Sequence, residues 1–124
     1  MTPGGPPSLD QARSLHRAGR LPEAERLYRA AAAAAPGDPR PAQALAVILR
    51  QTGRIDEALA VLERAAAVSP ADPSVRGELG LALESAGRLD EAITSLVRAT
   101  ALDPSVPHAQ FHLGRMYLMR GEPL

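Results

Sequence analysis

Apolar residues recur at intervals of three and four positions along most of the chain, with polar and charged residues between them. Leu45, Ala46 and Leu49 form one such group, and Ala58 and Leu62 belong to another. This spacing places apolar side chains on one face of an α-helix. The pattern therefore predicts an all-α chain of amphipathic helices at 8–18, 22–35, 39–52, 56–69, 73–86, 90–102 and 107–120.

The helices form a repeat of 34 residues, which becomes visible when the chain is aligned with itself. One column of that alignment holds only glycine: Gly19, Gly53, Gly87 and Gly121. Small residues fill a second column and proline fills a third: Ala12, Ala46, Gly80 and Gly114, then Pro36, Pro70 and Pro104. The repeat predicts three helix pairs and one extra helix, in units of about 5–38, 39–72, 73–106 and 107–124.

Each glycine of the first column lies where the first helix of a unit must end. Gly53 and Gly87 suit that place because glycine adopts the left-handed backbone conformation at little cost. Asp56 and Asp90 follow three residues later, and we expect their carboxylates to cap the free amides of the second helix. Pro22 takes this place in the first unit, and proline suits the first turn of a helix.

Each second helix is predicted to end before the proline that closes its unit. The next first helix then begins at Asp38-Pro39 or at Asp72-Pro73, an aspartate cap followed by proline at the first helical position. The small residues of the second column let the two helices of a pair approach closely. Because one pair cannot bury both of its faces, stability must come from the stacking of neighbouring pairs.

These columns resemble the tetratricopeptide repeat, a 34-residue helix–turn–helix unit with small residues at the helix crossing and a closing proline. Gly114 with Tyr117, and Ala92 with Leu96, match that family's pattern. The large aromatic residue common early in the family's first helix is absent from every unit. The resemblance implies a right-handed α-solenoid of antiparallel helix pairs over residues 8–124, in which the first helices line a concave groove.

By the same analogy, the groove would hold a peptide or extended protein segment, and the chain would be a protein–protein interaction scaffold. The residues facing the groove would be Leu9, Arg13, His16, Arg17, Arg40, Gln43, Val47, Arg50, Gly77, Leu81, Glu84, Phe111, Arg115 and Leu118. Function would then reside in these columns, which vary between units, because the recurrent columns are explained by packing and turn geometry.

Arginine predominates among the groove residues, with Glu84 as the opposing acid. A guanidinium group binds a carboxylate through two parallel hydrogen bonds, so such a groove would select an acidic segment or a chain terminus. The alternative is that these arginines are the solvated faces of amphipathic helices, and the sequence leaves both interpretations open. The chain has no Lys and no Asn, which excludes the paired lysine–asparagine clamp known in this family.

Charge and composition narrow the classes of partner. The 14 basic and 14 acidic residues balance, whereas a nucleic-acid binder normally carries a basic excess, so no nucleic acid is expected. No Cys is present, which excludes disulfides and thiol catalysis and suits a reducing compartment. Residues 1–7 are a predicted disordered leader without signal-peptide character, and no apolar run could span a membrane. We therefore expect a cytoplasmic protein with no membrane partner.

No arrangement of residues predicts catalysis. The Ser, His and Asp residues show no nucleophile elbow or triad spacing, and no glycine-rich phosphate loop is present. His108 and His112 lie four residues apart and could share a metal, with Glu78 as a further ligand. A solvated helix face is the favoured interpretation of this pair. The sequence therefore predicts no cofactor, no metal site and no enzyme activity in this chain by itself.

The last predicted helix suggests two alternative functions. Met116, Tyr117 and Met119 make it more apolar than a terminal helix of a repeat array normally is. Either a following helix of a longer protein covers this association face, or a second copy does and the chain is a self-associating homodimer. In the first case the array would be the N-terminal recognition or oligomerisation arm of a larger transferase- or hydroxylase-type enzyme, by family analogy alone.

Overall fold

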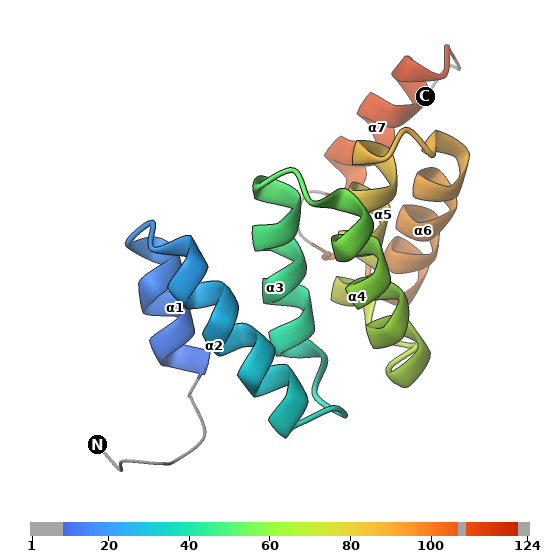
Figure 1. Cartoon of the computed structure of the whole chain (residues 1–124). Helices are drawn as coiled ribbons and strands as arrows, with labels where there is room; N and C mark the ends of the chain where they lie inside the picture. The colour runs from blue at the N-terminus through green and yellow to red at the C-terminus, as the bar shows by residue number, and fades with distance from the viewer. Residues whose placement is uncertain (1–8, 107–108, 122–124) are drawn as a thin grey trace.

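Paired antiparallel helices, stacked one pair after another, make up the computed structural model of the chain, which describes residues 9–106 and 109–121 (Figure 1). Seven helices and no strand are found in these residues. Their bounds are α1 Leu9–Arg17, α2 Leu21–Ala34, α3 Pro39–Gln51, α4 Ile55–Val68, α5 Pro73–Ser85, α6 Leu89–Leu102 and α7 Ala109–Met119. The all-α prediction is confirmed, and the helix bounds agree with the predicted ones to within two residues.

The turn within each pair is built around the recurrent glycine. Gly53 has a φ of +79°, in the left-handed region, and Gly19, Gly87 and Gly121 have the same value. The Gly53 amide donates to the Arg50 carbonyl at 3.1 Å, and the Arg54 amide donates to the Leu49 carbonyl at 2.7 Å. These two bonds satisfy carbonyls that the end of α3 leaves unpaired. The prediction made for the glycine column is confirmed.

Aspartate caps occur at the first helices α3 and α5 but not at the second helices α2, α4 and α6. The Asp38 carboxylate accepts from the Arg40 amide at 3.0 Å, and that of Asp72 accepts from the Ser74 amide at 2.9 Å, as predicted. The caps predicted at Asp56 and Asp90 are wrong, because α4 and α6 begin one residue earlier and no side chain caps them. The glycine turn leads directly into these helices, so both carboxylates lie inside the first turn, where they still favour the positive end of the helix dipole.

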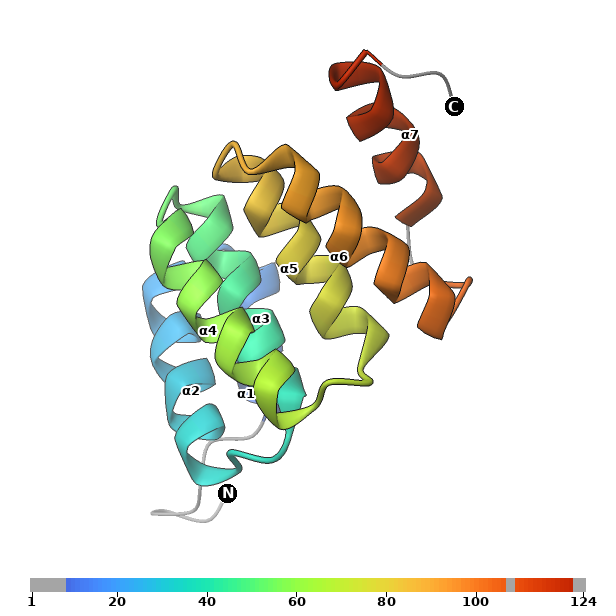
Figure 2. The same cartoon turned by 90° about the vertical axis from the view of Figure 1, so that its right-hand side faces the viewer.

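Small residues at the helix crossings are buried, except Gly114 of α7, which is half-buried. Ala12, Ala46, Ala58 and Ala92 have no exposed surface. Gly80 is packed still more tightly, since a Cβ added there would lie 2.8 Å from Leu96 Cγ and 3.2 Å from the Ala92 carbonyl oxygen. Helices α5 and α6 lie side by side (Figure 2). Their crossing is so close that it has no room for a methyl group at Gly80.

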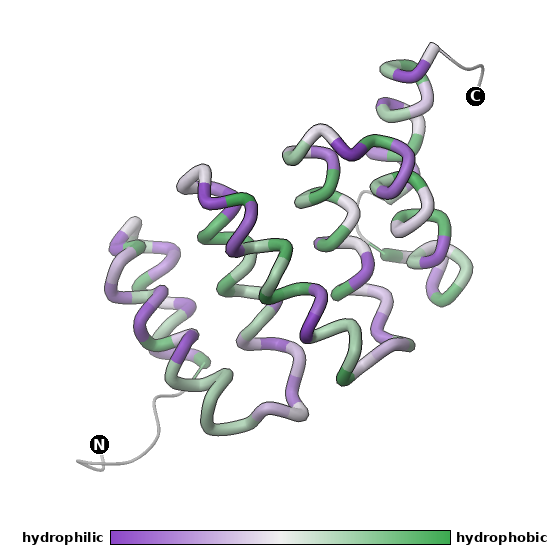
Figure 3. The backbone as a smooth tube through the Cα atoms, turned by 45° about the vertical axis from the view of Figure 1, so that its right-hand side comes forward, coloured by the Kyte–Doolittle hydropathy of each residue, from purple (hydrophilic) through white to green (hydrophobic). Residues whose placement is uncertain are grey.

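Larger apolar side chains fill the space between successive pairs. Each second helix packs against the first helix of the next pair, and α3 also contacts α5 directly. The largest fully buried side chains include Tyr28, Leu49, Leu62, Leu96 and Met116, spread from the first pair to the last helix. Figure 3 shows hydrophobic and hydrophilic positions interspersed along most of the helices. Within the described part of the chain, none of the helices has the length and apolar character needed to cross a membrane.

Candidate functional site

The first helices α1, α3, α5 and α7 share a face, here called the first-helix face, which carries the predicted groove residues. One repeat column crosses all four helices: Arg13, Val47, Leu81 and Arg115. Val47 and Leu81 are half-buried, whereas the side chains of Arg13 and Arg115 are 48% and 40% exposed. Apolar positions thus occupy the middle of the column and arginines occupy its ends.

Polar contacts join neighbouring first helices across this face. His16 Nε2 of α1 lies 3.1 Å from Gln51 Oε1 of α3, and the His16 ring stands edge-on to the buried Tyr28 ring. Arg50 Nη2 of α3 lies 3.6 Å from Glu78 Oε2 of α5, an ion-pair distance beyond hydrogen-bond reach. These groove residues therefore also connect one repeat to the next.

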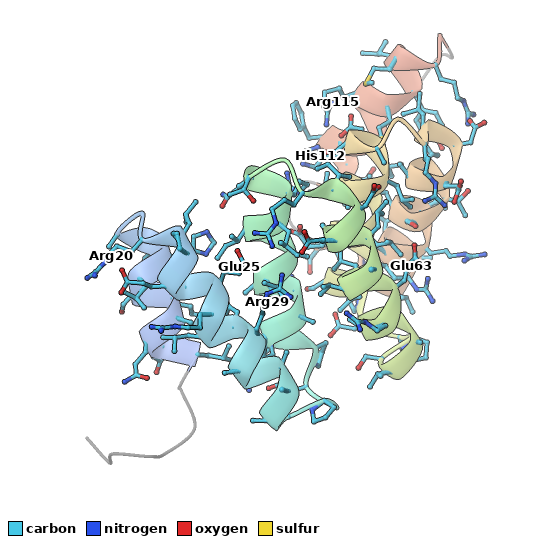
Figure 4. All side chains as sticks on the ribbon, viewed as in Figure 1. Arg20, Glu25, Arg29, Glu63, His112 and Arg115 are labelled. Atoms are coloured by element: carbon cyan, nitrogen blue, oxygen red, sulfur yellow. The ribbon has the colours of Figure 1, made fainter. Side chains whose placement is uncertain are left out.

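Arg115 of α7 makes the strongest of these links, to Glu84 of α5. Its Nη2 donates to Glu84 Oε1 at 2.7 Å, and its Nη1 donates to Glu84 Oε2. Nη2 also lies 3.1 Å from Nδ1 of His112, and Figure 4 labels both residues at the same edge of α7. The Glu84 side chain is only 12% exposed, so it depends on Arg115 for a charged partner. We therefore interpret this contact as a structural ion pair between α5 and α7.

The arginines nearer the N-terminus have more exposed side chains. Arg13 lies 3.8 Å from Asp10 in an exposed pair, and Arg40 Nη2 donates to Asp38 Oδ2 at 2.7 Å. That bond from Arg40 is the main cause that lowers the pKa of Asp38 below its ordinary value. Arg17 makes no ion pair with any residue that the structure describes. The sequence analysis opposed the groove arginines with Glu84 alone and missed Asp10, Asp38 and, beside Arg50, Glu78.

A hollow of about 110 Å³ opens on the first-helix face between α3, α5 and α7. Its lining residues are Gln43, Ser74, Gly77, Glu78, Leu81, Leu96, Val106 and His112. Gly77, predicted to face the groove, is buried, and a Cβ added there would lie 3.3 Å from Val106 Cγ1. Burial raises the pKa of Glu78 above its ordinary value, and the neighbouring Arg50 opposes that shift only in part.

Helix α7 exposes large apolar side chains, but not the set predicted from the sequence. Met116 is fully buried inside the chain, so the proposed association face cannot include it. Tyr117 is half-buried and Met119 is 58% exposed. Phe111 and Leu118, which the sequence placed in the groove, are 67% and 66% exposed. Met116 belongs to the buried apolar stripe of α7, a helix that packs against α6.

Of the two histidines weighed as a metal site and interpreted as a solvated helix face, only His112 can be placed, because His108 lies outside the described residues. His112 faces the hollow and Arg115. Among the residues described, no cluster of three His, Asp or Glu side chains could hold a metal ion.

The second helices carry an ion-pair network that sequence reasoning did not find. Arg54 donates to Glu25 through Nη1 and Nη2, at 2.7 and 2.9 Å, and also to Glu57 at 2.9 Å. Arg29 completes the network by pairing with Glu25 at 3.0 Å and Glu57 at 3.2 Å (Figure 4). The hydrogen bond from Arg54 lowers the pKa of Glu25. The recurrent Arg–Glu spacing of three was the available signal, but it did not reveal the contact between units.

An apolar hollow of about 440 Å³ also lies on this side, between the C-terminal halves of α2 and α4 and the start of α3. Ala32, Leu45, Val61 and Val68 are among its lining residues, and Val68 is 57% exposed. The hollow on the first helices is therefore lined by both polar and apolar residues, whereas this larger one on the second helices is lined mainly by apolar residues.

A family model of the tetratricopeptide repeat matches the chain at residues 8–39, 43–107 and 78–123. The chain therefore belongs to the tetratricopeptide repeat family, as the resemblance of its columns indicates. A search of curated protein sequences finds no match to it.

Several solved structures share the α-solenoid fold. The first tetratricopeptide domain of Spaghetti (RPAP3), bound to an HSP90 peptide, superposes with a TM-score of 0.84 at 18% identity, covering 91% of this chain and 90% of that one. The Yersinia enterocolitica type III secretion chaperone SycD, in complex with a peptide of the translocator YopD, gives 0.79 at 19% identity, covering 90% and 91%. These likenesses are below 25% identity and establish the fold alone.

A mutant of the Thermobaculum terrenum O-GlcNAc transferase has higher sequence identity to the chain. It gives a TM-score of 0.81 at 28% identity over 88% of this chain. The chain spans only 21% of that transferase, so the similarity is to its helical repeats and says nothing about transferase activity here.

Proposed function

We propose that this chain is a protein-interaction scaffold that holds an extended peptide segment on its first-helix face. The observation that carries the proposal is the column formed by Arg13, Val47, Leu81 and Arg115, which offers two half-buried apolar sites between the exposed Arg13 and the ion-paired Arg115. Family membership supports the scaffold role, and two structural neighbours were solved with peptides bound. Extended segments suit such a surface because their alternate side chains can enter successive sites.

The partner's acidic character, predicted from the arginine count, is best assigned to the α1 end of the face. Arg13 is held by one exposed carboxylate at 3.8 Å, and Arg17 is exposed on the same helix. A guanidinium group in such a setting can exchange water or a weak partner for a ligand carboxylate. Arg115 would first have to break its ion pair with Glu84, so we propose that it stabilises the stacking of the repeats and does not contact the ligand.

Charge insertion into the centre of the face tests the proposal. Affinity capture with the wild-type chain and with Val47→Glu should yield a partner that only the wild type retains. Val97→Glu is the matched control, since Val97 is 43% exposed on α6, on the opposite side of the helix pairs. Circular dichroism must show equal helicity for all three proteins. Capture that is lost with Val97→Glu and kept with Val47→Glu would move the binding site to the second helices.

A second candidate function is self-association through α7, because Phe111, Leu118 and Met119 are each more than half exposed on that one helix. Leu118→Glu should dissociate such a dimer in sedimentation experiments. A wild-type chain that sediments as a monomer at high concentration would eliminate this candidate.

The remaining alternative is that the array serves as a recognition or oligomerisation arm of a larger enzyme. The likeness to the helical repeats of a transferase supports this arrangement, while the activity of such an enzyme would reside outside the residues described above. We assign no catalytic step to this chain itself. The cytoplasmic location stays a prediction from the sequence.

A further inference from the structure

Glu78 occupies an unusual position on the first-helix face. Its side chain is 19% exposed and lines the hollow between α3, α5 and α7. Its Oε2 atom is buried and accepts no hydrogen bond from any of the residues described in the structure. The guanidinium of Arg50 approaches this oxygen to 3.6 Å, close enough for electrostatic attraction but not for a hydrogen bond.

An unsatisfied buried carboxylate oxygen destabilises a folded chain, because it loses water without gaining a donor. The groups that face Glu78 are Arg50 from α3, His112 from α7, and the uncharged Gln43 and Ser74. His112 is engaged with Arg115, which in turn is held by Glu84. A hydrogen-bond donor supplied by a ligand would therefore pair with Glu78 Oε2, which accepts no hydrogen bond from the described residues.

The hollow exists because its repeat column contains a glycine. The equivalent positions in the other units are Leu9, Gln43 and Phe111, whereas α5 has Gly77. Any side chain at that position would also press on Val106, since the added Cβ would lie 3.3 Å from Val106 Cγ1. The resulting space of about 110 Å³ can hold several water molecules, or the end of one long side chain.

We propose that this hollow receives the side chain of a lysine or arginine in the bound segment, whose charged end donates to Glu78 Oε2. Leu81, Leu96 and Val106 supply apolar surface for the methylene stem of such a side chain. The charged end supplies the hydrogen bond that Oε2 otherwise lacks. This inference rests on the proposed function, and it adds a specific basic position to a ligand whose acidic part contacts α1.

Selection from a displayed library of random 12-residue peptides tests the inference. The baits are the wild-type chain, Glu78→Gln and the control Glu63→Gln, in which an exposed carboxylate of α4 is neutralised. Wild type and Glu63→Gln should enrich peptides with Lys or Arg at one fixed position, and Glu78→Gln should lose that preference.

Titration of one selected peptide and its Lys→Gln or Arg→Gln version then completes a double-mutant cycle. The peptide substitution should weaken binding to the wild type at least tenfold and binding to Glu78→Gln less than twofold. A basic position enriched equally by Glu78→Gln would overturn the inference, as would enriched peptides with no basic position. If the wild type enriches no peptide over the bare support, the proposed function itself fails.

Discussion

The two halves of the first-helix face use arginine in opposite ways. In the N-terminal half, Arg13 and Arg17 lie on α1 with exposed side chains and at most a weak ion pair. In the C-terminal half, α5 contributes the half-buried acids Glu78 and Glu84, and these attract Arg50 and Arg115. The same residue type therefore serves as a candidate ligand contact in one half and as a link between repeats in the other.

The difference shows that a residue's repeat column does not determine its role. Arg13 and Arg115 occupy the same column, three repeats apart. Arg115 has an acidic partner on the neighbouring first helix, Glu84, which lies 31 residues away along the chain. Arg13 has no such partner on a neighbouring first helix and pairs only with Asp10 of its own helix. The first-helix face thus has a cationic end and an end whose charge is already balanced.

The largest effect should come from filling the tight crossing in the C-terminal half. Gly80→Val should reduce the free energy of unfolding by about 3 kcal/mol or more, because the added carbons overlap Leu96 and the Ala92 carbonyl. Urea denaturation measures the change. Gly37→Ala is the control, since nothing lies within 4 Å of a Cβ there. Equal stability of the two variants would contradict the close approach of α5 and α6.

Removing the acid that holds Arg115 should have the next largest effect. Glu84→Ala should lower the free energy of unfolding by about 1–2 kcal/mol, because two charge-assisted hydrogen bonds are lost. Water can replace them only in part, since the Arg115 side chain is 40% exposed. Asp10→Ala, which removes the exposed partner of Arg13, should cost less than about 0.5 kcal/mol. If thermal denaturation gave the same loss of stability for Glu84→Ala and Asp10→Ala, the two halves of the first-helix face would be energetically alike and the comparison would be wrong.

Charge reversal at the cationic end should change binding without changing stability. Arg13→Glu combined with Arg17→Glu should weaken the binding of an acidic peptide selected by the wild type about tenfold, which is about 1.4 kcal/mol of binding free energy. The loss should shrink at high salt, because both arginines are exposed. Isothermal titration measures it, with Arg26→Glu and Arg98→Glu on the second helices as the control. A similar loss in that control would indicate a general charge effect.

The smallest effect concerns the pH dependence of stability at Glu78. Its pKa is raised in the folded chain, so the stability it contributes is complete below its ordinary value of about 4.5 and is lost as the pH rises through the folded-state pKa. Glu78→Gln should therefore be more stable than wild type at pH 7, by about 1 kcal/mol or less, with the advantage shrinking on acidification. If Glu78→Gln were instead less stable than wild type at pH 7, attraction to Arg50 would outweigh the burial of the carboxylate.

The helices and their turns could be predicted from sequence because their causes are local. The left-handed glycines and the caps at Asp38 and Asp72 depend on residues a few positions apart. The caps expected at Asp56 and Asp90 failed because the glycine turn advances each second helix by one residue, a detail of backbone geometry below the precision of sequence patterns.

The candidate site was harder to predict because its contacts join different repeats. The sequence suggested the groove positions, but the partners Glu78 and Glu84 become evident only when the pairs are stacked. The hollow at Gly77 depends on Val106, which is 29 residues away. Burial of Met116 depends likewise on which side of α7 meets α6, and a short apolar run does not specify that side.

Amide NMR spectra recorded while a selected peptide is added test the central claim most directly. Binding on the first-helix face predicts that the largest shifts occur on α1, α3 and α5, including the amides of Arg13, Val47 and Leu81. The amides along the exposed sides of α2, α4 and α6 should shift little. Largest shifts around Val68 and the apolar hollow between α2 and α4 would contradict the account and place the binding site on the second helices.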